Sequence, residues 1–248
     1  MIGYLSLHLV EGMIAMPVIA FANSKGGSGK TTSALLLASE LATKWKTSLI
    51  DADPRHPLSR NWSKLPGKPP ELTVIENESE KTILNEIEAA ATTDPFVVID
   101  LEGTASRLMS LAISQADLVI IPMKEQQQDA QAALDVIKEL HRDMKAMRRQ
   151  IPYSVLFTQS KVAVKSRTSR HIASQFRSNN AIDTFTTEIY ERDAFSALFT
   201  IGGTVRELNA ATVNNLDRAI ENVAEFAAEV VKKLQRIQEG TKAEANSV

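Results

Sequence analysis

Short apolar runs alternate with amphipathic segments along most of the chain. The apolar runs predict buried strands at Pro17–Ala22, Thr47–Asp51, Leu72–Ile75, Phe96–Asp100, Leu118–Met123, Tyr153–Thr158 and Thr186–Ile189. The segments between them carry apolar residues at three- and four-residue spacings and predict helices at Thr31–Lys44, Glu80–Ala91, Arg107–Gln115, Asp129–Arg149 and Ser166–Arg177. This alternation is typical of a doubly wound α/β fold with a mostly parallel sheet and flanking helices.

A last helical segment, about Ala211–Gln238, repeats apolar residues on one face and should dock on the rest of the fold. Residues 241–248 are small and polar, which predicts a flexible tail. The strand and helix pattern continues without a linker between the two ends. We therefore expect a single domain over residues 16–240.

Composition narrows the possible functions. The 248 residues carry 28 Lys+Arg and 30 Asp+Glu, and 44% are hydrophobic, values near the average for soluble globular proteins. Cysteine is absent, which excludes disulfides, thiolate zinc sites and cysteine-ligated iron–sulfur clusters. Residues 1–15 form an apolar extension of unassigned role. Glu11 interrupts this extension and no basic start precedes it, so we expect no membrane insertion and a cytoplasmic location.

The segment Asn23–Thr32, NSKGGSGKTT, joins the first predicted strand to the first predicted helix. Its glycines let backbone N–H groups turn inward, the helix N-terminus adds positive potential, and Lys30 adds a full charge. The Thr31 hydroxyl is expected to bind Mg²⁺. The predicted phosphate-binding residues are consecutive: Gly26, Gly27, Ser28, Gly29, Lys30, Thr31 and Thr32.

The loop departs from the usual G-x-x-x-x-G-K-[ST] pattern, because Ser24 takes the place of the first glycine. Instead, Lys25–Thr32 matches the K-G-G-x-G-K-T-T signature of the deviant Walker-A ATPases of the ParA/MinD family, and the chain resembles that family. The resemblance implies a homodimer formed on Mg-ATP. Lys30 would act on the nucleotide of its own subunit and Lys25 on that of the partner, so both are predicted to be catalytic.

Two further apolar strands end in aspartates. In the family's D-x-D-P segment, which this sequence resembles, Asp53 orients the attacking water and is predicted to be catalytic, while Asp51 supports the magnesium shell. Asp100 ends the run FVVID, the form of a Walker-B segment that holds Mg²⁺ through water. Arg55 stands where the family commonly has glutamine, which leaves the contacts of this segment open.

Two further sets of polar residues bear on ligands. Gln159 stands where the family often has asparagine, and the resemblance implies that it hydrogen-bonds the nucleotide. The histidines show no metal-ligand spacing and are interpreted as surface or hydrogen-bonded side chains. They are His8, His56, His141 and His171.

Basic residues concentrate in the second half of the chain. Residues 138–177 hold ten Lys and Arg against Glu139 and Asp143, a local balance of +8. This favours contact with a nucleic-acid backbone without base reading, although a solvated face matched by acidic neighbours explains the same pattern. ParA-type proteins bind DNA nonspecifically as ATP dimers, and the resemblance implies the same contact here. The residues predicted to make it are Lys161, Lys165, Arg167 and Arg170.

The segment Tyr190–Phe195 resembles ParA-like proteins, particularly the VirC type associated with conjugative transfer of T-DNA. The function predicted is that of a ParA-like ATPase in plasmid or DNA partition. We expect it to be nucleoid-associated when ATP is bound and to be reset by ATP hydrolysis. A ParB-like centromere-binding protein or another protein is expected to stimulate that hydrolysis. One alternative is a VirC-type ATPase that recruits DNA to a conjugation apparatus. Another is a nucleotide-gated scaffold that positions proteins.

Overall fold

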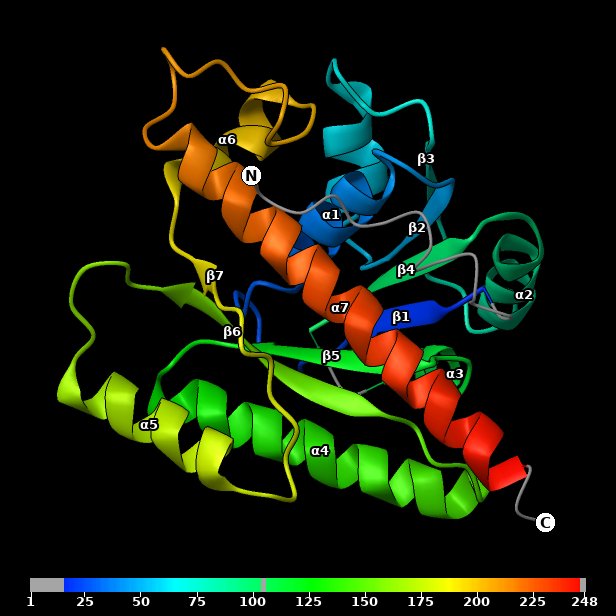
Figure 1. Ribbon diagram of the computed structural model, residues 1–248. Coiled ribbons are helices and arrows are strands. Elements are labelled where there is room, and N and C mark those ends of the chain that lie inside the picture. The colour runs from blue at the N-terminus through cyan, green and yellow to red at the C-terminus, as the bar shows by residue number, and fades with distance from the viewer. Residues whose placement is uncertain (1–15, 104–105, 246–248) are drawn as a thin grey trace.

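The computed structural model describes residues 16–103 and 106–245. In this part of the chain, seven parallel strands form a sheet in the order β3-β2-β4-β1-β5-β6-β7 (Figure 1). The strands are β1 (Val18–Phe21), β2 (Thr47–Ala52), β3 (Leu72–Glu76), β4 (Phe96–Leu101), β5 (Leu118–Met123), β6 (Tyr153–Ser160) and β7 (Ile189–Tyr190). The central strands β1, β2, β4 and β5 are buried along their whole length, as their unbroken apolar runs predict.

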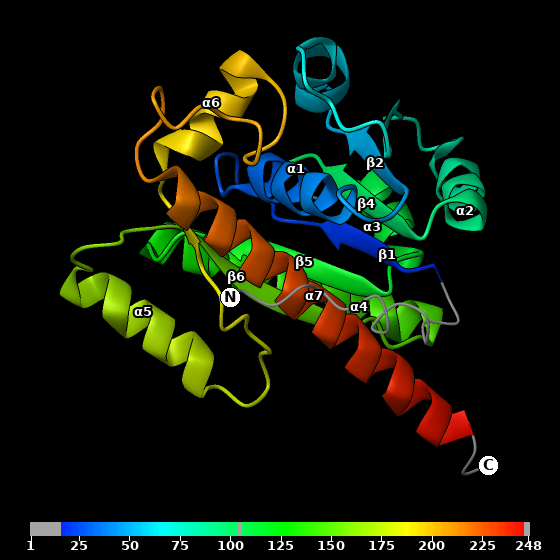
Figure 2. The same ribbon diagram turned by 45° about the horizontal axis from the view of Figure 1, so that its top comes forward.

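Helices cover both faces of the sheet, and Figure 2 separates the two layers. One layer contains α1 (Lys30–Leu41), α6 (Asp193–Ile201) and α7 (Leu216–Ala245). The other contains α2 (Ile83–Thr93), α3 (Arg107–Ser114), α4 (Gln127–Met147) and α5 (Arg167–Ser178). Each layer encloses its own apolar core, so the predicted doubly wound α/β fold is confirmed. Within the described part of the chain, no helix is long and apolar enough to cross a membrane.

The strand register gathers polar side chains at one edge of the sheet. Asp51 of β2 lies opposite Asp100 of β4, and Asp100 lies opposite Phe21 at the end of β1. The glycine-rich loop leaves β1 at this same edge. Because carboxyl ends of parallel strands meet there, this edge is where such sheets bind ligands.

The last strand differs from the prediction. Thr186–Ile189 was the expected range, but β7 contains only Ile189 and Tyr190. The backbone N–H groups of Thr186 and Thr187 donate to the Glu229 carboxylate of α7, at 2.7 and 2.8 Å. These two residues therefore bond to a helix side chain rather than to a neighbouring strand.

The C-terminal helix is also displaced from its predicted bounds. It starts at Leu216 instead of Ala211, because Asn215 adopts a left-handed φ of 53° that separates α7 from the preceding turns. It continues to Ala245, so residues 241–245 of the predicted tail are helical, where lysine, alanine and glutamate favour helix. The remainder of the predicted tail, 246–248, and the extension 1–15 lie outside the described residues.

Two helical segments had no counterpart in the prediction. Helix α6 follows β7, and a π-helical turn, Pro57–Asn61, leads into a 3₁₀ turn, Trp62–Lys64, after β2. Trp62 is buried and its indole N–H donates to the Gly203 carbonyl at 3.2 Å. The segment after β2 is thereby packed against the chain that follows α6.

Candidate nucleotide site

The loop between β1 and α1 has the backbone conformation of a phosphate cradle. Gly27 and Gly29 have positive φ values of 73° and 92°, which side chains rarely adopt. A Cβ on Gly29 would also lie 3.1 Å from the Thr158 side chain of β6. Glycine is therefore required at this position both by its dihedral angle and by the close approach of β6.

Hydrogen bonds to neighbouring strands hold this loop in place. Asn23 donates to the Pro122 carbonyl of β5 at 2.6 Å and accepts the Lys25 N–H at 2.8 Å. The Thr158 hydroxyl donates to the Ser28 carbonyl at 2.6 Å, and the Gln159 amide donates to the Gly27 carbonyl at 3.3 Å. These bonds fix the backbone of the cradle, and the hydrogen bond from Gln159 to a nucleotide stays a prediction.

Lys30 starts α1 and is buried under the loop, where its Nζ lies 3.4 Å from the Lys25 carbonyl. Burial lowers the pKa of Lys30, while the negative charges of Asp100 and Asp53 raise it. A Cβ on Gly103 would lie 3.4 Å from the Lys30 Nζ, so the chain after β4 passes close to this charge. The geometry concentrates one cation among carboxylates at the strand edge.

Asp100 of β4 is fully buried. Neither of its carboxylate oxygens accepts a hydrogen bond of normal geometry from a described residue. Burial raises the pKa of Asp100 to about 7, against the opposing effects of the Thr31 hydroxyl and the Lys30 charge. A buried carboxylate beside a threonine hydroxyl fits Mg²⁺, which prefers oxygen ligands. These residues are therefore suited to the predicted magnesium position.

Asp53 is buried and bound by its neighbour Arg55. The Arg55 guanidinium donates to both carboxylate oxygens, at 3.0 and 2.7 Å, and the Arg55 N–H adds a third bond at 2.9 Å. The hydrogen bonds from Arg55 hold the pKa of Asp53 below its usual value. Arg55, which stands where the family commonly has glutamine, therefore binds the Asp53 carboxylate that is predicted to orient water.

Asp51 faces the segment after β2. One of its carboxylate oxygens accepts the N–H groups of Leu58 and Ser59, at 3.0 and 2.7 Å, and the Ser59 hydroxyl at 3.0 Å. The other oxygen is buried without a hydrogen bond to a described residue. Asp51 anchors the π-helical turn, and only its second oxygen is left for the predicted role beside the metal.

Lys25 points away from Lys30. Its ammonium group pairs with the carboxylate of Asp129 in the first turn of α4, and 33% of its side chain stays exposed while Asp129 is fully buried. Sequence reasoning missed Asp129, because an aspartate in a first helical turn is commonly explained by the helix dipole. It missed Thr158 as well, since nothing in the apolar run of β6 marks that residue as a neighbour of the loop.

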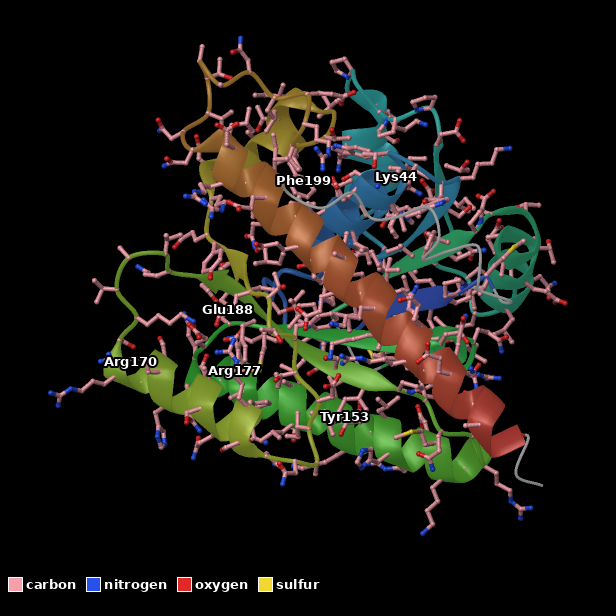
Figure 3. All side chains as sticks on the ribbon, in the orientation of Figure 1. Lys44, Tyr153, Arg170, Arg177, Glu188 and Phe199 are labelled. Carbon is pink, nitrogen blue, oxygen red and sulfur yellow. The ribbon has the colours of Figure 1, made fainter. Side chains whose placement is uncertain are left out.

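A cavity of about 420 Å³ opens beside the cradle, between α1, the end of β6 and α6. Thr32 of α1 lines it on one side. Aromatic and charged side chains from the end of β7 onward line the other: Tyr190, Glu191, Arg192, Phe195 and Phe199. Phe199 is labelled on α6 in Figure 3. A cavity of mixed polar and aromatic lining next to a phosphate cradle is a candidate small-molecule site.

The predicted DNA-contact residues divide into two groups. Lys165 pairs with two buried carboxylates, Glu125 at 2.7 Å and Glu188. Arg177 also pairs with Glu188, and the two point toward each other in Figure 3. Lys161, Arg167 and Arg170 are exposed instead and form no ion pair with a described residue.

The ten basic residues of segment 138–177 show the same division. Four have acidic partners in the fold: Lys138, Arg149, Lys165 and Arg177. Six have none among the described residues: Arg142, Lys145, Arg148, Lys161, Arg167 and Arg170. Acidic neighbours therefore match part of the excess positive charge, and the rest faces solvent from α4 and the start of α5.

One histidine contradicts its interpretation. His56 is fully buried, and neither ring nitrogen makes a hydrogen bond of normal geometry with a described residue. The sequence shows only a polar residue after a turn, which predicts a surface position. His141 and His171 are exposed as expected, and His8 lies outside the described residues.

Comparisons with known proteins identify the family of this chain. The family model of the VirC1 protein matches residues 16–241. Protein ParA of Rhizobium radiobacter is 36% identical over 220 residues, which cover 88% of this chain and 98% of the relative. Among solved structures, apo McdA of Cyanothece aligns with a TM-score of 0.68 at 16% identity and covers 84% of this chain and 98% of its own.

A plasmid partition protein of Borrelia burgdorferi, solved with AMPPNP bound, aligns with a TM-score of 0.63 at 19% identity, over 88% of this chain and 99% of that one. At such identities the two structures support the fold alone. The family rests on the sequence matches, which extend over nearly the whole described chain. The chain belongs to the VirC1 family, within the ParA/MinD-like P-loop ATPases.

Proposed function

We propose that this protein is an ATP-driven switch of the ParA type. It dimerises on Mg-ATP, binds DNA nonspecifically in that state, and returns to the monomer when ATP is hydrolysed. Its biological role is the partition of a plasmid or other DNA, with a ParB-like or other partner that stimulates hydrolysis.

One observation carries the proposal: the two lysines of a single loop have different environments. Lys30 is buried near Asp53 and Asp100, where it would meet the phosphates of a nucleotide bound by its own subunit. Lys25 is one-third exposed and pairs with Asp129 outside that cluster. A second lysine held at the rim is suited to a nucleotide bound by another subunit.

Hydrolysis of a phosphoanhydride by water needs positioning and charge stabilisation more than covalent chemistry. Thr31 and Asp100 would hold Mg²⁺, which supplies positive charge against the phosphate oxygens when bound. Lys30 and the backbone N–H groups of Gly26–Gly29 orient the phosphates. Asp53 orients the attacking water once a carboxylate oxygen is released from Arg55.

The cavity beside the cradle takes the nucleoside in this proposal. Tyr190 lines the cavity and supplies an aromatic ring for a purine, and Gln159 lies between the cavity and the phosphate loop. Arg192 packs over the Tyr190 ring, with 5.5 Å between the guanidinium carbon and the ring centroid. This contact holds the ring in place where the base would stack.

The DNA contact is proposed for the exposed residues Lys161, Arg167 and Arg170. They follow the carboxyl end of β6, at the same edge of the sheet as the nucleotide loop. Figure 3 shows Arg170 reaching into solvent from the first turn of α5. A dimer places two such groups on one assembly, so nucleotide-driven dimerisation would raise the affinity for a DNA backbone.

The test compares the wild type with Lys25→Ala and Asp129→Asn, and Lys46→Ala is a control because it replaces an exposed lysine far from the loop. ATP turnover and binding to a random-sequence duplex are measured with ATP, ADP or no nucleotide over a range of salt. We expect ATP-dependent, salt-sensitive DNA binding in the wild type and the control. Lys25→Ala should lose it.

Asp129→Asn should instead increase basal ATP turnover. Loss of the carboxylate frees Lys25 from a partly exposed ion pair worth about 1 kcal/mol, so basal turnover should rise about fivefold. DNA binding that ignores the nucleotide, or that persists unchanged in Lys25→Ala, would show that the switch proposed here does not exist.

The match to the VirC1 family model favours a second role, recruitment of DNA to a conjugative transfer apparatus. The nucleotide and DNA steps are the same in both roles. The two roles differ in the process that fails when the protein is absent. Loss of a plasmid from dividing cells supports partition, whereas a defect limited to transfer between cells supports recruitment.

A further inference from the structure

An imidazole and two carboxylates converge beside the segment that carries Asp53. His56 directly precedes the π-helical turn, Glu76 is the last residue of β3, and Glu78 follows two residues later. One possible ligand atom from each of the three side chains lies within 4.8 Å of the others. The cluster includes neither Asp100 nor Lys30, so a ligand bound by it would not depend on the proposed ATP switch.

His56 is fixed and aimed at the carboxylates. Its φ and ψ of 49° and 54° are left-handed, and its backbone N–H donates to the Asp53 carbonyl at 2.8 Å. Its Nε2 lies 3.8 Å from a Glu76 oxygen and contacts a Glu78 oxygen. The buried ring is thus held with its Nε2 directed at two carboxylates, and neither ring nitrogen makes a hydrogen bond of normal geometry with a described residue.

Glu76 is prepared as an anionic ligand. The Arg60 guanidinium donates to both of its oxygens, one at 3.0 Å, and the Ser59 hydroxyl adds a bond at 3.2 Å. Hydrogen bonds from Arg60 lower the pKa of Glu76 to about 2, so it is ionised at neutral pH. Hydrogen bonds of this kind orient the carboxylates of metal sites, and lone pairs remain for coordination.

We propose that His56, Glu76 and Glu78 bind a divalent cation of the Zn²⁺ or Co²⁺ class. One imidazole nitrogen with two carboxylates suits these ions, whereas Mg²⁺ prefers oxygen ligands alone. Metal–ligand distances near 2.0–2.2 Å place neighbouring ligand atoms roughly 3.3 Å apart in a tetrahedral site. Water would complete the coordination.

The observed spacing is close to this requirement. The 3.8 Å between His56 and Glu76 needs only a small contraction. Glu78 lies closer to His56 than two ligands of one metal can, but 46% of its side chain is exposed, so it can rotate outward. A bound cation would then tie the segment Asp53–His56 to the end of β3.

The competing explanation is an ion pair between His56 and Glu78 that binds no metal. The experiment uses the full-length, metal-free chain without nucleotide and measures Co²⁺ binding by equilibrium dialysis, together with the visible absorption of bound Co²⁺. Excess Mg²⁺ is included, so that oxygen-only sites are filled. The wild type should bind about one Co²⁺ per chain.

The variants His56→Asn and Glu78→Gln remove one ligand each. Asparagine tolerates the left-handed conformation, and Glu78 is exposed enough to be replaced without unfolding the protein. His171→Asn and Glu80→Gln are the matched controls. We expect Co²⁺ affinity to fall at least tenfold in both site variants and to remain unchanged in both controls.

Thermal unfolding gives a second readout. Zn²⁺ should raise the melting temperature of the wild type and of the controls, but not that of Glu78→Gln. If the wild type binds Co²⁺ no more tightly than Glu78→Gln, or if His171→Asn abolishes binding, the cluster is only an ion pair and the proposal is wrong.

Discussion

The nucleotide edge of the sheet and the basic surface at the start of α5 both concentrate charge, but they do so in opposite ways. At the nucleotide edge Lys30, Asp53 and Asp100 are all buried, with exposures of 6%, 2% and 0%. On the basic surface Lys161, Arg167 and Arg170 are exposed and form no ion pair with a described residue.

This difference predicts how each region responds to change. Buried charges interact strongly with one another and shift each other's pKa, so one substitution there alters the whole cluster. Exposed charges are screened by salt, and each contributes a small, nearly additive amount. The nucleotide edge should therefore fail at single positions, while the basic surface should weaken gradually.

Replacement of Lys30 should have the largest effect. Lys30→Ala removes a buried cation that we propose contacts the phosphates, and charge-assisted hydrogen bonds of this kind are each worth about 1.5–3 kcal/mol. Two such bonds correspond to a loss of ATP affinity of at least a hundredfold. Fluorescence titration with a labelled ATP analogue measures it directly.

Lys64→Ala is the matched control, because Lys64 is an exposed lysine at the end of the 3₁₀ turn. Circular dichroism shows whether each variant is folded. Normal ATP affinity in a folded Lys30→Ala variant would mean that nucleotide binds elsewhere and that the site assignment is wrong.

Much of the fold and of the nucleotide loop could be predicted from the sequence. Strands such as Leu118–Met123 are buried on both faces, so their apolar runs are unbroken. The loop Lys25–Thr32 is contiguous, and its chemistry is fixed by residue type and order. Local patterns of this kind need no information about the rest of the chain.

Contacts between distant segments were not predictable in this way. Asp129 meets Lys25 across 104 positions of sequence, and Thr158 approaches the loop only because β6 pairs beside β5. Glu125 and Glu188 neutralise Lys165 for the same reason. A count of charges along the sequence includes Lys165 in the basic surface, whereas the fold pairs it with buried acids.

Asp100→Asn should have an intermediate effect that depends on pH. The folded pKa of Asp100 is raised to about 7, while its unfolded value is near 3.9. Between these values the folded state binds the proton more tightly, so wild-type stability falls as pH rises through this window. An asparagine carries no charge and avoids this loss.

The melting temperature of Asp100→Asn should therefore match that of the wild type near pH 4 and exceed it by about 10 °C above pH 7, without nucleotide or metal. Asp217→Asn, an exposed carboxylate on α7, is the control and should show no such trend. A constant difference across the pH range would indicate that Asp100 is not perturbed by burial.

The smallest effect per residue is expected on the basic surface. Arg167→Glu with Arg170→Glu should weaken binding to random-sequence DNA and reduce the slope of log affinity against log salt by about 2, because each phosphate contact contributes about 1. Lys165→Met should leave this slope unchanged, since Lys165 is held by Glu125 and Glu188, and should lower thermal stability instead. An equal loss of salt dependence in Lys165→Met would mean that Lys165 leaves Glu125 and Glu188 when the protein binds DNA. Ion pairing within the protein would then not determine which basic residues of this surface contact DNA.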